Sequence, residues 1–147
     1  MKKTIIAILA VAIIAGLAVL GYQKFKLAAP LAQVPVVTPQ EGLVVNTPTA
    51  HATVLSPLVV SGYIDGKNRW TGFEGQVGTV RLLDDNGDLL TMGILTATTD
   101  WMQFPTSFST TLTFPAPVTA VGTLVFKNEN PSGMPDYERE FILPVKF

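Results

Sequence analysis

The C-terminal two thirds of this chain are predicted to fold as an all-β antiparallel sandwich, preceded by one N-terminal transmembrane helix and a proline-rich linker. Three observations support this prediction. Residues 4–23 form an unbroken, uncharged and mostly apolar run, and several prolines lie within residues 27–52. From residue 53 onward, short alternating segments are separated by turn residues at roughly 8–12-residue spacing, which is typical of sandwiches and barrels.

The N-terminal segment, residues 1–26, has the length of a membrane anchor. Lysines bracket the apolar run on both sides. At about 1.5 Å per residue, a helix over this run spans roughly 30 Å, the thickness of the hydrocarbon core of a bilayer. A cleaved signal peptide is the alternative, but its apolar region is usually about 7–15 residues long and precedes a small-x-small site, which is poor here. We therefore expect an uncleaved anchor with the rest of the chain outside the cytoplasm.

Residues 27–52 are expected to be a flexible linker. They contain Pro30, Pro35, Pro39 and Pro48, and no apolar period persists among them. Proline-rich chains extend by about 3.1 Å per residue, so the linker would be a stalk if ordered or a simple tether if disordered. Short strands at 34–37 and 43–45 are not expected, because prolines interrupt strand pairing.

Residues 53–147 show the pattern of an antiparallel β domain. Residues 107–114 alternate between apolar and hydroxyl-bearing side chains, and residues 140–147 place Phe141, Leu143, Val145 and Phe147 on one face. Pro144 lacks an amide donor and indicates an edge or a bulge there. The expected strands are 53–56, 58–64, 75–83, 89–97, 107–114, 122–127 and 140–147.

Turn residues and aromatic residues complete this prediction. Asn86-Gly87 is a strong hairpin signal, and 130–133 has the composition of a turn with Pro at its second position. Six or seven strands in about 95 residues correspond to an immunoglobulin-like sandwich. The expected aromatic core consists of Trp101, Phe104, Phe108, Phe114, Phe126 and Phe141.

Composition excludes several classes of function. Residues 53–147 contain six basic and ten acidic side chains, a net charge of about −4. An acidic domain is a poor partner for nucleic acid, because phosphate binding needs a basic surface. The chain contains no cysteine, which excludes disulfides, thiol catalysis, cysteine-ligated zinc and a lipoprotein attachment site.

Few residue patterns point to catalysis or to metals. Asp84, Asn86 and Asp88 resemble the start of a calcium loop, but the required Gly and Glu do not follow, so a hairpin turn is favoured over a weak calcium site. His51 is the only histidine and is expected to be a solvated linker residue. Glu74 and Asp100 are formally a carboxylate pair, as any acidic domain contains. We expect neither an enzyme nor a cofactor.

One loop has the composition of a binding surface. Residues 66–75 are rich in glycine and contain Arg69, Trp70, Phe73 and Glu74. Aromatic and charged side chains on a loop held by a rigid sandwich can stack on sugar rings or anchor a peptide. In the alternative interpretation, Trp70 or Phe73 folds back and caps one end of the core.

Several short motifs of residues 53–147, in their order and spacing, resemble the bacterial spore germination immunoglobulin-like domain family, often called Gmad2. They are Ser56-Pro57-Leu58, Val60-Ser61-Gly62, Gly72-Phe73-Glu74-Gly75, Val80-Arg81-Leu82-Leu83-Asp84, Asp100-Trp101-Met102, Leu124-Val125-Phe126, Asn130-Pro131-Ser132-Gly133 and Ile142-Leu143-Pro144-Val145. The resemblance implies an immunoglobulin-like fold in a bacterial envelope protein. It supplies no catalytic residues.

Together these observations predict a membrane-anchored, extracytoplasmic and noncatalytic module. Its expected partner is cell-wall glycan or another envelope protein. The alternative is a structural subunit that assembles through an edge strand, for which residues 141–147 are the first candidate.

Overall fold

The computed structural model describes residues 41–147, which form seven β-strands and one short 3-10 helix. The transmembrane helix predicted within residues 1–26 lies outside the described residues. Within 41–147, no helix is long and apolar enough to span a membrane. The elements are β1 (Leu43–Thr47), β2 (Leu58–Ile64), β3 (Gln76–Asp84), β4 (Leu89–Ala97), β5 (Thr106–Leu112), β6 (Val121–Asn128), η1 (Pro135–Tyr137) and β7 (Glu140–Lys146).

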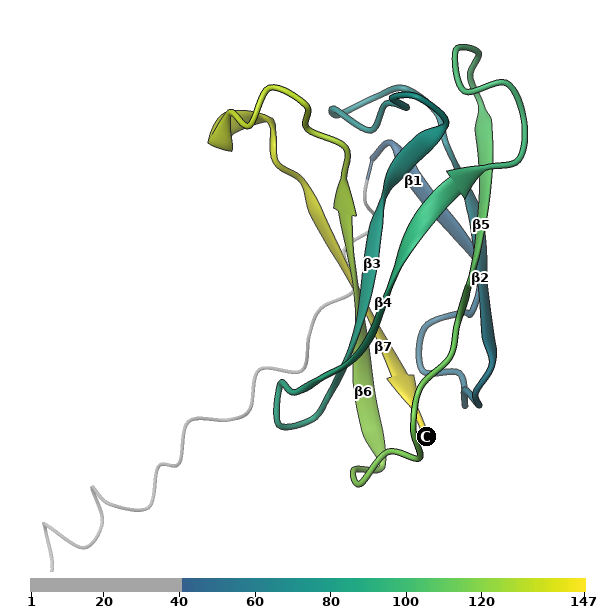
Figure 1. The fold of residues 1–147 in the computed structure, drawn as a ribbon, viewed down its shortest axis with the longest axis vertical. Coiled ribbons are helices and arrows are strands. Elements are labelled where there is room, and N and C mark those ends of the chain that lie inside the picture. The colour runs from purple at the N-terminus through teal and green to yellow at the C-terminus, as the bar shows by residue number, and fades with distance from the viewer. Residues whose placement is uncertain (1–40) are drawn as a thin grey trace, which may run out of the picture. The chain divides into compact units, whose positions relative to one another are not determined.

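The strands pair in the order β1-β2-β5-β4-β3-β6-β7, and every ladder is antiparallel. The pairing of β4 with β5 is short, because it joins only Thr96 to Ser109 and Ala97 to Phe108. This short ladder is the junction between two layers, one formed by β1, β2 and β5 and the other by β4, β3, β6 and β7 (Figure 1). The two layers form the predicted immunoglobulin-like sandwich.

Strand β1 contradicts the prediction that all of residues 27–52 form a flexible linker. Residues 43–47 were expected to belong to a flexible linker extending to residue 52, but they pair antiparallel with β2. The prolines that suggested a linker do not interrupt this strand, because Pro48 follows its last residue. A strand at the edge of a sheet, paired on one side, tolerates a proline next to it. The ordered β domain therefore begins before Thr53.

The segment after β1 crosses to the other layer. Val54 N donates to Lys146 O at 2.8 Å, and Lys146 N donates to Ala52 O at 2.9 Å. His51 N donates to Pro144 O at 2.7 Å, so His51 is exposed but is part of the folded domain rather than of a linker. The predicted strand 53–56 is reduced to one parallel bridge, Thr53 to Lys146. Strand β7 is therefore the last strand of its sheet, as Pro144 indicated, but its outer edge is partly covered.

The core lies between the two layers and follows the predicted alternation. Phe108, Phe114, Phe126 and Phe141 are buried as expected. The prediction was wrong for two other aromatic residues: Phe104 is 48% exposed and Trp101 is only half-buried, because both lie in the loop between β4 and β5. The buried tryptophan is Trp70. Among the described residues, the buried core runs from Leu43 to Val145, and this stretch lies within one compact unit of the chain, residues Pro35–Phe147.

Candidate functional site

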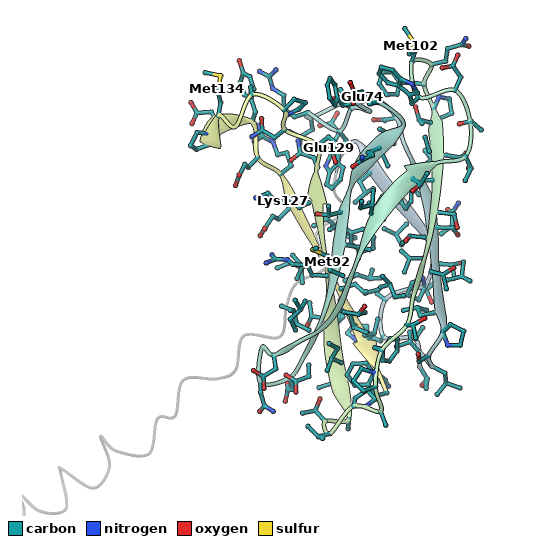
Figure 2. All side chains as sticks on the ribbon, in the orientation of Figure 1. Glu74, Met92, Met102, Lys127, Glu129 and Met134 are labelled. Carbon is teal, nitrogen blue, oxygen red and sulfur yellow. The ribbon has the colours of Figure 1, made fainter. Side chains whose placement is uncertain are left out.

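Three loops meet at one end of the sandwich. They connect β2 to β3, β4 to β5, and β6 to β7, and Figure 1 shows them at the top of the view. Figure 2 labels Glu74, Met102 and Met134, which belong to these three loops and lie at this end. Loops at the end of an immunoglobulin-like sandwich are a common location for binding residues, because the sheets hold them in place.

The predicted binding residues do not form one surface. Trp70 is fully buried, so it caps the core and is not available to a ligand. Phe73 and Glu74 lie in a tight turn that is closed by two hydrogen bonds between Phe73 and Gln76. This turn exposes Phe73 and Glu74. Arg69 is also exposed, but it faces a different loop.

Arg69 lines a cleft between the β2–β3 loop and the β6–β7 loop. The cleft has a volume of about 330 Å³, and its other lining residues include Thr71, Glu129, Asn130, Ser132 and Tyr137. The guanidinium carbon of Arg69 lies 3.9 Å from the centroid of the Tyr137 ring. This contact is a cation–π interaction, which favours a position of the guanidinium over the ring. We call this feature the end cleft.

The backbone of residues 67–70 directs Arg69 toward the end cleft. Asn68 and Arg69 have φ values of 46° and 66°, in the left-handed region that L residues adopt infrequently. Trp70 N donates to Lys67 O at 2.9 Å and closes this turn. The turn therefore places Trp70 in the core and its neighbour Arg69 at the surface.

Asn128 holds the two sides of the end cleft together. Its Nδ2 donates to Arg69 O at 2.8 Å and to Tyr137 O at 3.0 Å, and its Oδ1 accepts from Arg139 N at 2.8 Å. The side chain is buried. Buried polar groups with all their hydrogen bonds made are rigid, so the cleft is formed before a ligand arrives.

Local sequence patterns do not reveal the residues that the β6–β7 loop contributes. Residues 130–133 show only the composition of a turn, and no pattern points to Tyr137. One signal was present: Asn128 continues the inward-facing series Gly122, Leu124, Phe126 along β6. A polar residue at an inward-facing position needs partners inside the fold, and these partners are the two loops of the cleft.

The other chemical patterns are structural. Asp84 Oδ1 accepts hydrogen bonds of 2.9 Å from the backbone amides of Asn86 and Asp88, which confirms the predicted hairpin turn. Asp100 caps its own turn by accepting from Met102 N. Within residues 41–147, no group of three or more His, Cys, Asp or Glu side chains is arranged to hold a metal ion.

The pKa of Asp65 is lowered, mainly because the backbone N–H of Lys67 donates to its carboxylate. The Lys67 ammonium, 3.2 Å away, acts in the same direction. This interaction stabilises the start of the β2–β3 loop.

The fold and the loop cleft define a class of protein, the immunoglobulin-like modules that present loops from one end of a sandwich. The chain belongs to the Gmad2 family, described as the immunoglobulin-like domain of bacterial spore germination, whose profile matches residues 42–135. The match confirms the family resemblance and begins immediately before β1. No match was found among curated proteins or among solved structures.

Proposed function

We propose that this chain is a noncatalytic binding module of the bacterial envelope and that its ligand occupies the end cleft. The observation that carries this proposal is the contact between Arg69 and Tyr137 at the wall of the cleft, where the guanidinium carbon lies 3.9 Å from the centroid of the ring. The volume of about 330 Å³ falls at the small end of the range for ligand sites. A rigid and charged cleft of this size suits one or a few units of a polymer.

The proposed location is the cell membrane, crossed once, with the β domain outside the cytoplasm. This proposal is supported by the apolar run at residues 4–23, by its flanking lysines and by the bacterial family of the domain. In that location the available partners are cell-wall glycan, with the peptides attached to it, and neighbouring envelope proteins.

A noncatalytic role agrees with how the polar groups of the cleft are used. Asn130 Nδ2 donates to Met134 O, and Ser132 Oγ donates to Asn130 Oδ1. These groups hold the loop in shape, and neither bonds to a base that would activate it. Catalysis by a nucleophile needs such a base within hydrogen-bond distance.

Co-sedimentation with purified cell-wall sacculi tests the proposal. A fragment of residues 41–147 is expected to pellet with sacculi, and Arg69→Ala is expected to abolish pelleting without loss of cooperative unfolding. Arg81→Ala is the matched control, because Arg81 lies on the outer face of the sheet and pairs with Glu140 at 3.3 Å. Equal pelleting of all three proteins would place the site elsewhere. Pelleting of none would exclude the wall as partner.

A second candidate function is assembly through strand β4. The sequence suggested β7 as the free edge, but the hydrogen bonds to residues 51–54 cover part of it. Strand β4 pairs with β5 only at Thr96 and Ala97, so its residues 89–95 have a partner strand on one side only. Unlike protected edges, this stretch has no charge or proline, and Met92 and Ile94 are exposed.

The proposed occupant of this edge is the β4 strand of a second copy. Antiparallel pairing of two uncharged strands brings no like charges together. Sedimentation velocity over a range of concentrations is expected to show a dimer that Ile94→Lys abolishes. Val118→Lys is the control, because Val118 is highly exposed and lies outside the strands. A parent protein that remains monomeric throughout would exclude this function.

A further inference from the structure

The end cleft contains one cation and one carboxylate that the fold does not neutralise. Arg69 and Glu129 both line it. Residues 41–147 form three ion pairs, and neither Arg69 nor Glu129 takes part in them. Figure 2 shows Glu129 near the loop end of the molecule, away from Met92 on the sheet. The cleft therefore presents both signs of charge to whatever enters it.

Some side chains that line the cleft are hydrogen-bonded within the protein and hold the cleft in shape, whereas others are available to a ligand. Asn128 donates hydrogen bonds to both loops, and Asn130 and Ser132 are bonded to each other and within the β6–β7 loop. By contrast, the described residues supply no hydrogen-bond partner for the Arg69 guanidinium or the Glu129 carboxylate. A ligand can therefore bind these two groups without breaking any bond that holds the cleft in shape.

The geometry of Arg69 favours a carboxylate as its partner. The guanidinium carbon lies over the Tyr137 ring, 3.9 Å from its centroid, and a contact with the ring face leaves N–H groups of the guanidinium free. The guanidinium edge matches the two oxygens of a carboxylate and binds them with two parallel hydrogen bonds.

Glu129 decides between classes of ligand. A phosphate or a polyanion would be repelled by its carboxylate. A neutral glycan would leave both charges without a counter-charge while removing water from them, which is costly. A ligand that carries a carboxylate and an ammonium group avoids both penalties.

We propose that the end cleft binds a short zwitterionic peptide, with its carboxylate on Arg69 and its ammonium group on Glu129. This inference rests on the proposed binding function and names its ligand class. Peptide chemistry also fits the volume of about 330 Å³, which is too small for a folded partner but within the range for small ligands. Such peptides occur free and as parts of the cell wall.

Titration of the ¹⁵N-labelled fragment 41–147 with trialanine, trialanine amide and N-acetyl-trialanine tests the inference. Trialanine is expected to shift the amide signals of both cleft loops. Each derivative lacks one charge and is expected to bind at least about tenfold more weakly, as for the loss of a charge-assisted hydrogen bond. Equal affinity for all three peptides, or no shift in the cleft, would overturn the inference.

A change of specificity is the sharpest test of orientation. Glu129→Gln is expected to remove the preference for trialanine over N-acetyl-trialanine but to keep the preference over trialanine amide. Arg69→Gln is expected to do the reverse, and Arg81→Gln should change neither. If these side chains had only a structural role, each substitution would weaken the binding of all three peptides by the same factor. That result would overturn the assignment.

Sacculi stripped of their peptides distinguish this inference from the proposed function. Binding to intact but not to stripped sacculi supports both. Equal binding to both preparations, lost on Arg69→Ala, would overturn the peptide inference and leave a glycan-binding module.

Discussion

The Nδ2 atom of Asn128 donates a 2.8 Å hydrogen bond to the backbone carbonyl of Arg69. The two residues are 59 positions apart in the sequence, yet this bond fixes the backbone of Arg69 beside the end cleft. The same amide bonds to the backbones of Tyr137 and Arg139. One buried side chain therefore couples both loops of the cleft to β6.

Replacement of Asn128 is expected both to lower the unfolding free energy of the domain and to loosen the end cleft. Asn128→Ala leaves two carbonyls and one amide without partners, which costs about 2–3 kcal/mol of unfolding free energy. Urea denaturation measures this loss. Asn130→Ala is the control: its half-buried side chain bonds only within its own loop, so we expect a loss below about 1 kcal/mol. Equal stability of the two variants would contradict the coupling role of Asn128.

Trp70 is expected to act as a core residue in mutagenesis. Trp70→Ala empties a fully buried site and should cost about 3–5 kcal/mol. Trp70→Phe should cost clearly less, because it refills part of the space. It also removes the indole Nε1–H, a buried donor with no partner among the described residues. Thermal or urea unfolding of both variants checks this order, and a harmless Trp70→Ala would show that the tryptophan lies at the surface.

Most strands were predictable because their local patterns agree with their burial. The bounds 58–64 and 89–97 coincide with β2 and β4, and the predicted bounds of β3, β5, β6 and β7 differ by one or two residues. The predicted strand 53–56 is the exception, because only a single bridge forms there. Strand β1 was missed because its environment, not its composition, makes it a strand: it lies among prolines and depends on β2 as its only partner. Local sequence also could not decide whether Trp70 or Trp101 is buried in the core, because both lie in loops without a periodic pattern.

The candidate site was predictable only in part. Arg69 was identified from the composition of its loop. For Trp70 next to it, the sequence left open a binding role and a core-capping role, and its full burial decides for the core. Tyr137 and Glu129 reach the cleft through the pairing of β3 with β6, and sequence spacing alone does not show this proximity. The left-handed turn at Arg69 is also invisible in a local pattern, because arginine has no preference for it.

Gly62 is expected to be required for the pairing of β1 with β2. A Cβ at this position would lie 2.0 Å from Val44 O and 2.8 Å from the Phe108 ring. A backbone oxygen in a paired strand cannot move alone, so Gly62→Ala should displace β1 and cost more than about 2 kcal/mol, as in other overpacked sites.

Gly87→Ala is the comparison for Gly62→Ala. Gly87 has a φ of 86° and open space around its Cα, so only backbone strain of about 1 kcal/mol is expected. Urea denaturation and amide hydrogen exchange along β1 separate the two variants. Unchanged protection of residues 43–47 in Gly62→Ala would show that β1 does not pack against Gly62.

Asp84 is expected to stabilise the β3–β4 hairpin without calcium. Its buried carboxylate accepts two backbone amides and, at 3.3 Å, the Asn86 side chain, so a cation would have to displace donors already aimed at it. Asp84→Ala should cost about 1.5–3 kcal/mol, and Asp84→Asn less, because it keeps one acceptor oxygen. Calcium at about 10 mM, above the affinity range of extracellular calcium modules, should not change the urea midpoint. A midpoint raised by calcium in the parent but not in Asp84→Ala would establish a metal site in place of the turn.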